Sequence, residues 1–174
     1  MSDAPAYFAW ASDARVSVYT YWETHRDIGM TRRALQSAED KISQGTAVEW
    51  GVFLQQKQDP EQLIGTIGLY GLTACGTPEG TADFGYCLGR YWWGKGYATE
   101  AGKVLFESNC PVALGLQKIT AQTVEENIQS GRVLEKIGFV RQSPNAINSD
   151  GESIEVKGIW YPVLKYLWTF PKEG

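Results

Sequence analysis

The sequence predicts one domain of the mixed α/β class, with a mostly antiparallel sheet flanked by helices. Apolar residues recur at helical spacing in the N-terminal third, and β-branched and aromatic residues dominate three runs between residues 46 and 88. A single strand–helix–strand unit follows these runs. The chain has 174 residues, a usual size for one domain, and we find no linker or internal repeat that would divide residues 1–174.

Two helices are expected before the sheet. Asp3 to Trp10 is predicted to form a short helix. A second helix is predicted to begin at Thr31, a residue type that caps helices well, and to end near Ser43. Gly45 is the expected stop, because glycine suits the left-handed position after a helix.

Three strands are expected next, over residues 46–54, 62–72 and 82–88. The first two are predicted to pair in antiparallel fashion, because the turn-forming run 58–61 (QDPE) separates them. A helix from Tyr97 to about Asn109 follows, limited by Pro111, which lacks a backbone donor.

The C-terminal part is predicted to hold a strand over residues 118–123 and a helix over residues 127–137, which Gly138 ends. Residues 139–142 and 154–168 are then expected to form a hairpin across the turn-forming run at 148–151 (NSDG).

The composition argues against several classes of function. The chain has 16 Lys and Arg residues against 20 Asp and Glu, a formal net charge of −4, which disfavours nucleic-acid binding. No apolar run is long enough for a membrane-spanning helix, and the first seven residues lack the features of a signal peptide. Cys75, Cys87 and Cys110 share no close spacing, and His25 is the one histidine, so we expect reduced thiols, a cytoplasmic location and no metal.

The most informative stretch is residues 89–101, GRYWWGKGYATEA, which follows a strand and opens a helix. Its glycines would present backbone N–H groups at the positive end of the helix, a suitable place for a phosphate. A plain turn with a helix cap explains the glycines equally well. A P-loop needs Ser or Thr where Gly96 stands, and a Rossmann fingerprint needs glycine where Thr99 stands, so both match weakly.

A third phosphate motif fits better. Residues 93–98, WGKGYA, followed by TEA, resemble the pyrophosphate loop of the GNAT superfamily of acyl-CoA N-acyltransferases. Trp93 stands where most of that family has Gln or Arg, and in this it resembles the subgroup of ribosomal-protein N-terminal alanine and serine acetyltransferases. Residues 127–139, NIQSGRVLEKIGF, resemble the N-x-x-S-x-x-v-l-E-k-x-G-F signature of the same subgroup. Gly85-Tyr86 and Trp50 fit as well, so the resemblance spans residues 46–142.

The resemblance implies a GNAT fold, with one departure. Members of the subgroup begin with a strand, whereas this sequence starts at what resembles the following helix. We therefore expect the sheet to lack its first edge strand. An unpaired edge favours association with another chain, so a homodimer is expected.

The resemblance also implies a binding site for acetyl-CoA, between the strand that ends near Leu88 and the strand at 119–123. Its pyrophosphate would lie on backbone N–H groups of the glycine loop, to which Lys95 and Arg90 could add charge if they are not simply solvated. The implied cofactor-binding residues are Cys87, Leu88, Gly89, Trp93, Gly94, Lys95, Gly96, Tyr97, Ala98, Thr99, Asn127 and Ser130.

Two catalytic residues are implied as well. Many GNAT enzymes carry a tyrosine acid where Leu134 stands here, so Ser130 becomes the expected proton donor to the departing thiolate. Asn127 is expected both to cap its helix and to contact the cofactor arm. As the base that deprotonates the amine, Asp83 ranks first, ahead of Glu49 and of Glu100, which suits the helix N-terminus. His25 is expected to be structural or exposed.

These observations together predict an acetyl-CoA-dependent N-acetyltransferase that acts by direct transfer to a primary amine, either a protein N-terminus or a small molecule. A catalytically idle CoA-binding interaction module and, less favoured, a P-loop-like phosphate-binding protein are the alternatives. The acceptor pocket is expected between the N-terminal helices and the C-terminal hairpin. Aromatic residues that could line it are Tyr19, Tyr21, Trp22, Trp92, Trp160 and Tyr161.

Overall fold

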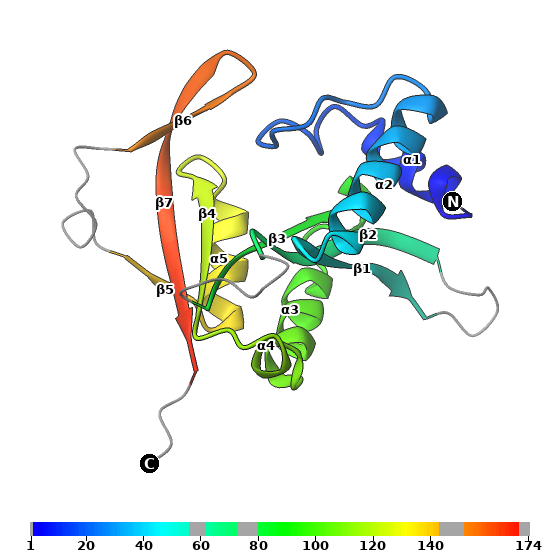
Figure 1. Ribbon diagram of the computed structural model, residues 1–174. Helices are drawn as coiled ribbons and strands as arrows, with labels where there is room; N and C mark the ends of the chain where they lie inside the picture. Colours follow the sequence, from blue (N-terminus) through cyan, green and yellow to red (C-terminus); the bar gives the residue numbers. More distant parts are fainter. Residues whose placement is uncertain (1, 56–61, 73–79, 143–151, 171–174) are drawn as a thin grey trace.

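A computed structural model describes residues 2–55, 62–72, 80–142 and 152–170. Its strands form one mixed sheet in the order β1-β2-β3-β4-β7-β5, and β6 pairs with β7 (Figure 1). The strands are β1 (Ala47–Leu54), β2 (Gln62–Tyr70), β3 (Thr81–Leu88), β4 (Lys118–Val124), β5 (Val140–Arg141), β6 (Ser153–Val156) and β7 (Ile159–Thr169). The helices are α1 (Ala4–Ala11), α2 (Ile28–Ser43), the short 3₁₀ helix η1 (Arg90–Trp92), α3 (Tyr97–Glu107), α4 (Cys110–Ala113) and α5 (Ile128–Ile137).

The parallel pair β3–β4 creates a gap in the sheet. The other strand pairs are antiparallel, but β3 and β4 run in the same direction and pair only from Thr81 opposite Lys118 to Asp83 opposite Thr120. Beyond that point the two strands separate (Figure 1). The sequence-based prediction of a mixed, mostly antiparallel sheet is confirmed, and the gap lies where the family resemblance implied it.

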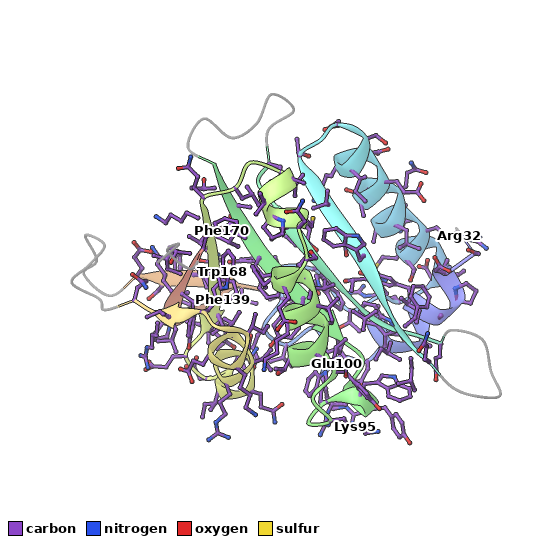
Figure 2. All side chains as sticks on the ribbon, turned by 90° about the horizontal axis from the view of Figure 1, so that it is seen from below. Arg32, Lys95, Glu100, Phe139, Trp168 and Phe170 are labelled. Carbon is purple, nitrogen blue, oxygen red and sulfur yellow. The ribbon has the colours of Figure 1, made fainter. Side chains whose placement is uncertain are left out.

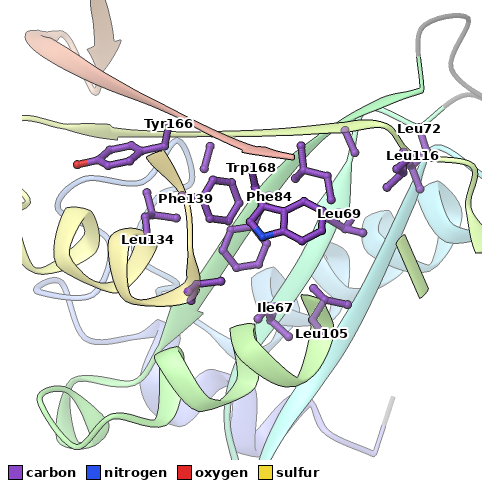
Figure 3. Packing of buried hydrophobic residues seen from close by; sticks show 14 residues of the cluster. Ile67, Leu69, Leu72, Phe84, Leu105, Leu116, Leu134, Phe139, Tyr166 and Trp168 are labelled. Carbon is purple, nitrogen blue, oxygen red and sulfur yellow. The ribbon is translucent and has the colours of Figure 1, made fainter. Parts of the chain in front are cut away.

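One face of the sheet carries the main hydrophobic core, under α3 and α5. Phe84 of β3 lies in this core beside Phe139 (Figure 3), with 5.4 Å between the ring centroids. The ring of Phe106 lies 5.2 Å from that of Phe84. Leu134 of α5 and Ile119 of β4 are almost completely buried beside them. This apolar packing holds the helices that flank the gap in a defined position.

The opposite face is covered by α1 and α2 over β1 and β2 (Figure 1). A smaller cluster forms there from Trp10, Ala11 and Val16, with Tyr7, Trp22, Cys87 and Trp93 packed against it. This cluster is richer in rings than the main core, and several of its members are only half buried.

The predicted start of α2 was wrong by four residues. The helix begins at Ile28 rather than after Thr31, because the Asp27 carboxylate accepts a hydrogen bond of 2.8 Å from the Met30 amide and caps it. Thr31 is instead fully buried and lies 2.9 Å from Nδ1 of His25. The predicted stop is confirmed, since Gly45 follows the last cap residue with φ of 69°.

The predicted C-terminal hairpin was also wrong in part. The run 154–168 is not one strand: Lys157 and Gly158 turn it into the hairpin of β6 and β7, both with positive φ (53° and 81°). β5 pairs with the far end of β7 as expected, with Val140 opposite Leu167. The runs 58–61 and 148–151, predicted as turns, lie outside the described residues, as does Cys75.

β1 lies at one end of the strand order and, among the described residues, pairs with β2 alone. This agrees with the expected open edge. No helix in the part of the chain that the structure describes is long and apolar enough to cross a membrane.

Candidate functional site

The glycine loop between β3 and α3 is shaped to receive an anion. Gly94 and Gly96 have φ of 71° and 89°, and Gly96 caps the N-terminus of α3. A Cβ added at either glycine would meet nothing within 4 Å, so the backbone is open to approach from outside. The first N–H groups of α3 have no partner within the helix, and they point out of its positive end. Figure 2 shows Lys95 and Glu100 together at this end of α3.

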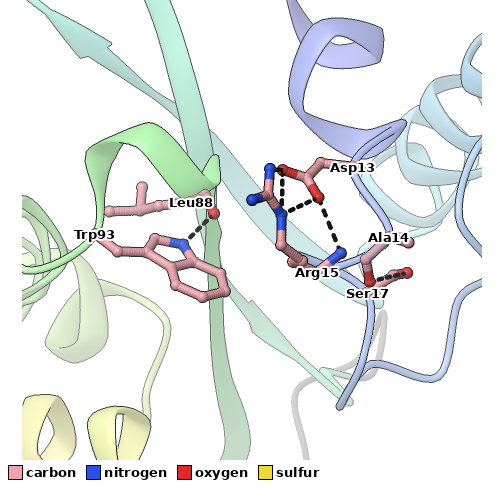
Figure 4. A network of polar contacts seen from close by, with 6 residues as sticks. All are labelled: Asp13, Ala14, Arg15, Ser17, Leu88 and Trp93. Carbon is pink, nitrogen blue, oxygen red and sulfur yellow. Dashed lines mark hydrogen bonds and ion pairs between the residues drawn. The ribbon is translucent and has the colours of Figure 1, made fainter.

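Trp93 ties the loop back to the sheet. Its indole Nε1 donates a hydrogen bond of 2.6 Å to the carbonyl of Leu88, the last residue of β3 (Figure 4). The Arg90 guanidinium lies 5.0 Å from the centre of the Trp93 ring, and the Lys95 ammonium lies 3.9 Å from that of Tyr91. These contacts explain physically why a tryptophan stands where Gln or Arg is usual: it anchors the loop from within.

The other wall of the gap is the start of α5. Asn127 caps this helix, accepting a hydrogen bond of 3.3 Å from the Ser130 amide, as predicted. The Tyr86 hydroxyl of β3 donates to Oγ of Ser130 at 3.2 Å and so spans the gap. Burial raises the pKa of Tyr86 to about 12, so its phenol stays protonated at neutral pH. Leu134 points into the core, where it is 2% exposed, rather than into the gap.

Asp83 lies at the closed end of the gap, on the face covered by α1 and α2. It is exposed, and the Thr120 hydroxyl donates a hydrogen bond to its carboxylate. A pocket of about 200 Å³ lies beside it, lined in part by Tyr70 and Lys118. Asp83 and Thr120 are the last residues at which β3 and β4 pair.

The loop between α1 and α2 reaches across the same face to the far side of the gap. Its Tyr21 hydroxyl accepts a hydrogen bond of 3.0 Å from the Gln122 side chain of β4, and the rings of Tyr19 and Tyr161 meet edge to face at 5.8 Å. The Lys157 ammonium at the β6–β7 turn donates to the carbonyl of Ser17. Helical loop and hairpin therefore meet over the gap, where the acceptor pocket was expected.

A family model described as the acetyltransferase (GNAT) domain matches residues 1–140. The chain belongs to the GNAT acetyltransferase family. The sequence-based predictions of a GNAT fold and of an N-acetyltransferase that uses acetyl-CoA are thereby confirmed at the level of the family.

Two relatives of similar sequence are also named as N-acetyltransferases. The chain is 28% identical over 142 residues to the uncharacterized N-acetyltransferase p20 of Bacillus licheniformis, covering 82% of this chain and 76% of p20. It is 31% identical over 141 residues to the uncharacterized N-acetyltransferase YoaA of Bacillus subtilis, covering 80% of this chain and 75% of YoaA.

Solved structures show the same fold. One is the spermidine N-acetyltransferase of Vibrio cholerae in complex with CoA and spermine, with a TM-score of 0.73 and 17% identity. The match covers 97% of this chain and 90% of that protein's chain. The ribosomal-protein-S5-alanine acetyltransferase of Vibrio fischeri matches with a TM-score of 0.73 at 22% identity, covering 97% and 88%.

The GNAT fold brings the cofactor residues predicted from the sequence to the rim of one gap. Residues 87–99 run from the end of β3 through the glycine loop into α3, and Ser130 in the first turn of α5, which Asn127 caps, contacts Tyr86 across the gap. Trp92 lies on this loop, 6.1 Å from the Tyr97 ring, and not with the acceptor aromatics. Trp160 is 66% exposed.

Sequence reasoning left out several residues around the gap and on the adjoining face of the sheet. Tyr86 was noted as part of a motif but not as the partner of Ser130, and Tyr70 and Tyr7 were not singled out. The signal for Tyr70 was present: Gly68 and Gly85 lie inside strands, and such glycines mark a close approach by another group. In the described ranges, no group of three or more His, Cys, Asp and Glu residues could hold a metal ion.

Proposed function

We propose that this chain moves an acetyl group from acetyl-CoA to a primary amine by direct transfer, without a covalent enzyme intermediate. The observation that carries the proposal is the open glycine loop at the N-terminus of α3, placed directly beside the gap between β3 and β4. Named relatives that acetylate amines support it, among them a spermidine and a ribosomal-protein-alanine acetyltransferase.

The residues present fit acetyl-CoA. The bare backbone at Gly94 and Gly96 leaves room for a pyrophosphate, and the free N–H groups up to Thr99 supply donors for it. Carbonyl groups of the last residues of β3 would accept hydrogen bonds from the pantetheine arm, although that of Leu88 already accepts one from Trp93. When bound, acetyl-CoA supplies an activated thioester carbonyl. We propose Cys87, Leu88, Gly89, Trp93, Gly94, Lys95, Gly96, Tyr97, Ala98, Thr99, Asn127 and Ser130 as its binding residues.

Proton transfer requires an acid and a base. Ser130 is the proposed acid, because it lies in the first turn of α5 at the gap and its hydroxyl accepts a hydrogen bond from Tyr86. A proton given up by Ser130 could be replaced by that of Tyr86. Asp83 is the base that the sequence predicts, and it lies on the face from which the acceptor would approach.

The glycine loop can be tested by placing a side chain in it. Gly94→Glu puts a carboxylate where the pyrophosphate would lie, so calorimetric titration should show no measurable acetyl-CoA binding. Gly115→Glu is the matched control, because Gly115 also has positive φ (67°) and open space at its Cβ, but lies in the loop before β4. Equal affinities of the two variants would refute the assignment of the loop.

An assay of CoA thiol release distinguishes an enzyme from a catalytically idle module. An enzyme should liberate CoA thiol from acetyl-CoA when a primary amine is added, whereas an idle module binds acetyl-CoA without release. This alternative is kept because the buried Leu134 stands where many GNAT enzymes carry a tyrosine that acts as the acid.

The acceptor class and the cellular setting are part of the same proposal. We propose a protein N-terminus or a small amine as acceptor, bound under the loop that carries Tyr19 and Tyr21. We also propose that residues 1–174 act as one unit in the cytoplasm, where acetyl-CoA would be met. Pairing of two β1 edges, which expose Trp50 and Phe53, is the proposed route to a homodimer, and light scattering would test it.

A further inference from the structure

Glu49 of β1 is a half-buried carboxylate without a cationic partner in the described residues. The ion pairs found there join Arg15 to Asp13 and Lys165 to Glu152. Removing a carboxylate from water has a cost that a neighbouring cation normally offsets. A bound cation could therefore complete the site around Glu49.

Tyr70 lies beside Glu49 on the sheet. Its hydroxyl stands over Gly68, the residue opposite Glu49, and after burial the negative charge of Glu49 is the next cause that raises the pKa of Tyr70. The Tyr70 ring lies flat over two glycines: a Cβ at Gly68 would stand 2.8 Å from the Tyr70 hydroxyl, and one at Gly85 would stand 3.1 Å from the ring. Glu49 pairs with Gly68, which pairs with Gly85, so carboxylate and glycines share one row of the sheet. A side chain at Gly68 or Gly85 would collide with Tyr70, so the two glycines leave room for its ring beside Glu49.

Three groups near Glu49 feel its negative charge, and each is a phenol or a thiol. Burial, and then the negative charge of Glu49, raise the pKa values of Tyr7 and of Cys87, the latter to about 12. The pKa of Tyr70 is raised by the same two causes in the same order. The two phenols and the thiol therefore stay protonated and neutral at neutral pH.

Aromatic rings beside Glu49 suit a cation as well. The ring of Tyr7 lies 4.1 Å from that of Trp10, which in turn lies 6.4 Å from that of Trp22. Ring faces attract ammonium groups, most strongly where water is partly excluded. A carboxylate next to partly buried rings is a chemistry that recognises an alkylammonium group.

The position relative to the gap favours Glu49 over Asp83. The row of Glu49 ends at Gly85, directly before Tyr86, whose hydroxyl marks the level of the proposed acid. Asp83 lies three residues before Tyr86, about 10 Å along the strand. There β3 and β4 are still paired, and Thr120 already engages the carboxylate of Asp83.

We propose that Glu49 binds the ammonium group of the acceptor and takes its proton, directly or through one water, with Tyr70 as the residue that positions it. This inference rests on the proposed acetyl transfer. One proton passes from the ammonium to Glu49, and the neutral nitrogen then forms a bond to the thioester carbonyl carbon. The carbon–sulfur bond breaks and the thiolate takes a proton from Ser130. The second proton, which leaves the nitrogen, replaces the one that Ser130 gave up, and Glu49 releases the first proton to water.

The test compares Glu49→Gln, which keeps the shape and a hydrogen-bond acceptor for Tyr70, with Asp83→Asn and with Glu107→Gln at the exposed end of α3. The probes are spermidine and an alanine-initiated tripeptide amide. Glu49→Gln should lower kcat/KM about 100-fold, in the range of general base catalysis. It should also weaken calorimetric binding of the amine probe, measured without acetyl-CoA, at least tenfold, while acetyl-CoA affinity stays within twofold.

The positioning role of Tyr70 needs a readout that a structural role would not move. Tyr70→Phe should lower kcat/KM about tenfold, and the double variant with Glu49→Gln should lose no more than Glu49→Gln alone, because both act through one carboxylate. Additive losses would overturn this role for Tyr70.

Two outcomes separate the inference from the proposed function. If Glu49→Gln keeps both amine binding and turnover while Asp83→Asn loses turnover, Asp83 is the base and the inference fails with the function intact. If the wild-type chain transfers no acetyl group, the proposed function fails, and the calorimetric arm alone decides whether Glu49 binds the ammonium.

Discussion

The two faces of the sheet differ in composition: one is closely packed and apolar, and the other holds polar groups, not all of which have a hydrogen-bond partner among the residues that the structure describes. Under α3 and α5 the side chains are apolar and closed in, and Phe84 contacts rings on every side. Under α1 the face holds a carboxylate, neutral phenols and a thiol, and the Trp10 indole N–H is buried without a hydrogen-bond partner in the described residues. A natural core rarely leaves such a donor unpaired.

This difference separates stability from activity along one set of strands. Alternate residues of β3 point to opposite faces of the sheet: Phe84 packs in the main core, Cys87 packs against the cluster under α1, and Asp83 is exposed on the same face as Cys87. Substitutions on the first face should therefore act on the free energy of unfolding, and those on the second or at the gap should act on binding and turnover.

The largest effect is expected from Phe84→Ala in the main core. Removing a buried phenyl ring costs about 3–5 kcal/mol of unfolding free energy, because Phe84 is 6% exposed and its neighbours cannot fill the space. Urea denaturation measures the loss. Phe53→Ala, at a side chain that is 42% exposed, is the control and should cost under about 1 kcal/mol. Similar losses for both variants would show that the core is not where the stability lies.

The second effect is expected at the gap. Ser130→Ala should lower turnover about 100-fold, as loss of a general acid does, while the acetyl-CoA affinity and the unfolding free energy change little. Steady-state kinetics together with calorimetry separate these quantities. Ser43→Ala, at the exposed end of α2, controls for the loss of a hydroxyl. Unaltered turnover would remove Ser130 from the acid role.

Much of the fold follows from local patterns, and the errors show where such patterns stop. The strands β1 to β4 were predicted close to their bounds because apolar and β-branched residues mark them strongly. Asp27 and Thr31 are both good helix caps, but Asp27 caps the Met30 amide while Thr31 is buried against His25, and the sequence alone does not show this. The turn at Lys157 was missed because it lies inside a run of strand-forming residues, and lysine seldom takes positive φ.

The features of the site also fall into two kinds, those set by neighbouring residues and those set by contacts between strands. The glycine loop and the cap at Asn127 depend on neighbouring residues, so the sequence predicted them. The position of Tyr70 beside Glu49 depends on strand register, which sets Gly68 opposite Glu49 and leaves room for the Tyr70 ring over Gly68. Register across several strands results from packing and turn geometry together, and a single sequence does not specify it in advance.

The smallest effect concerns His25, which belongs to the α1 side yet has a structural role. It is 4% exposed, stacks on Tyr7 at 5.8 Å and contacts Thr31. Burial lowers its pKa, although nearby Asp27 opposes this. Below about pH 6.5 the unfolded chain therefore takes up a proton that the folded chain resists.

Stability should consequently be unaffected by His25 above about pH 6.5 and should fall as the pH drops below that value, by at most about 1.4 kcal/mol per pH unit. Thermal unfolding between pH 7.5 and 5.5 measures this slope, which is readily assigned because the chain has one histidine. His25→Gln keeps a polar partner for Thr31 and should flatten the slope. An unchanged slope in that variant would assign the pH dependence to carboxylates, and the ring cluster around Tyr7 would then hold no titrating group in this range.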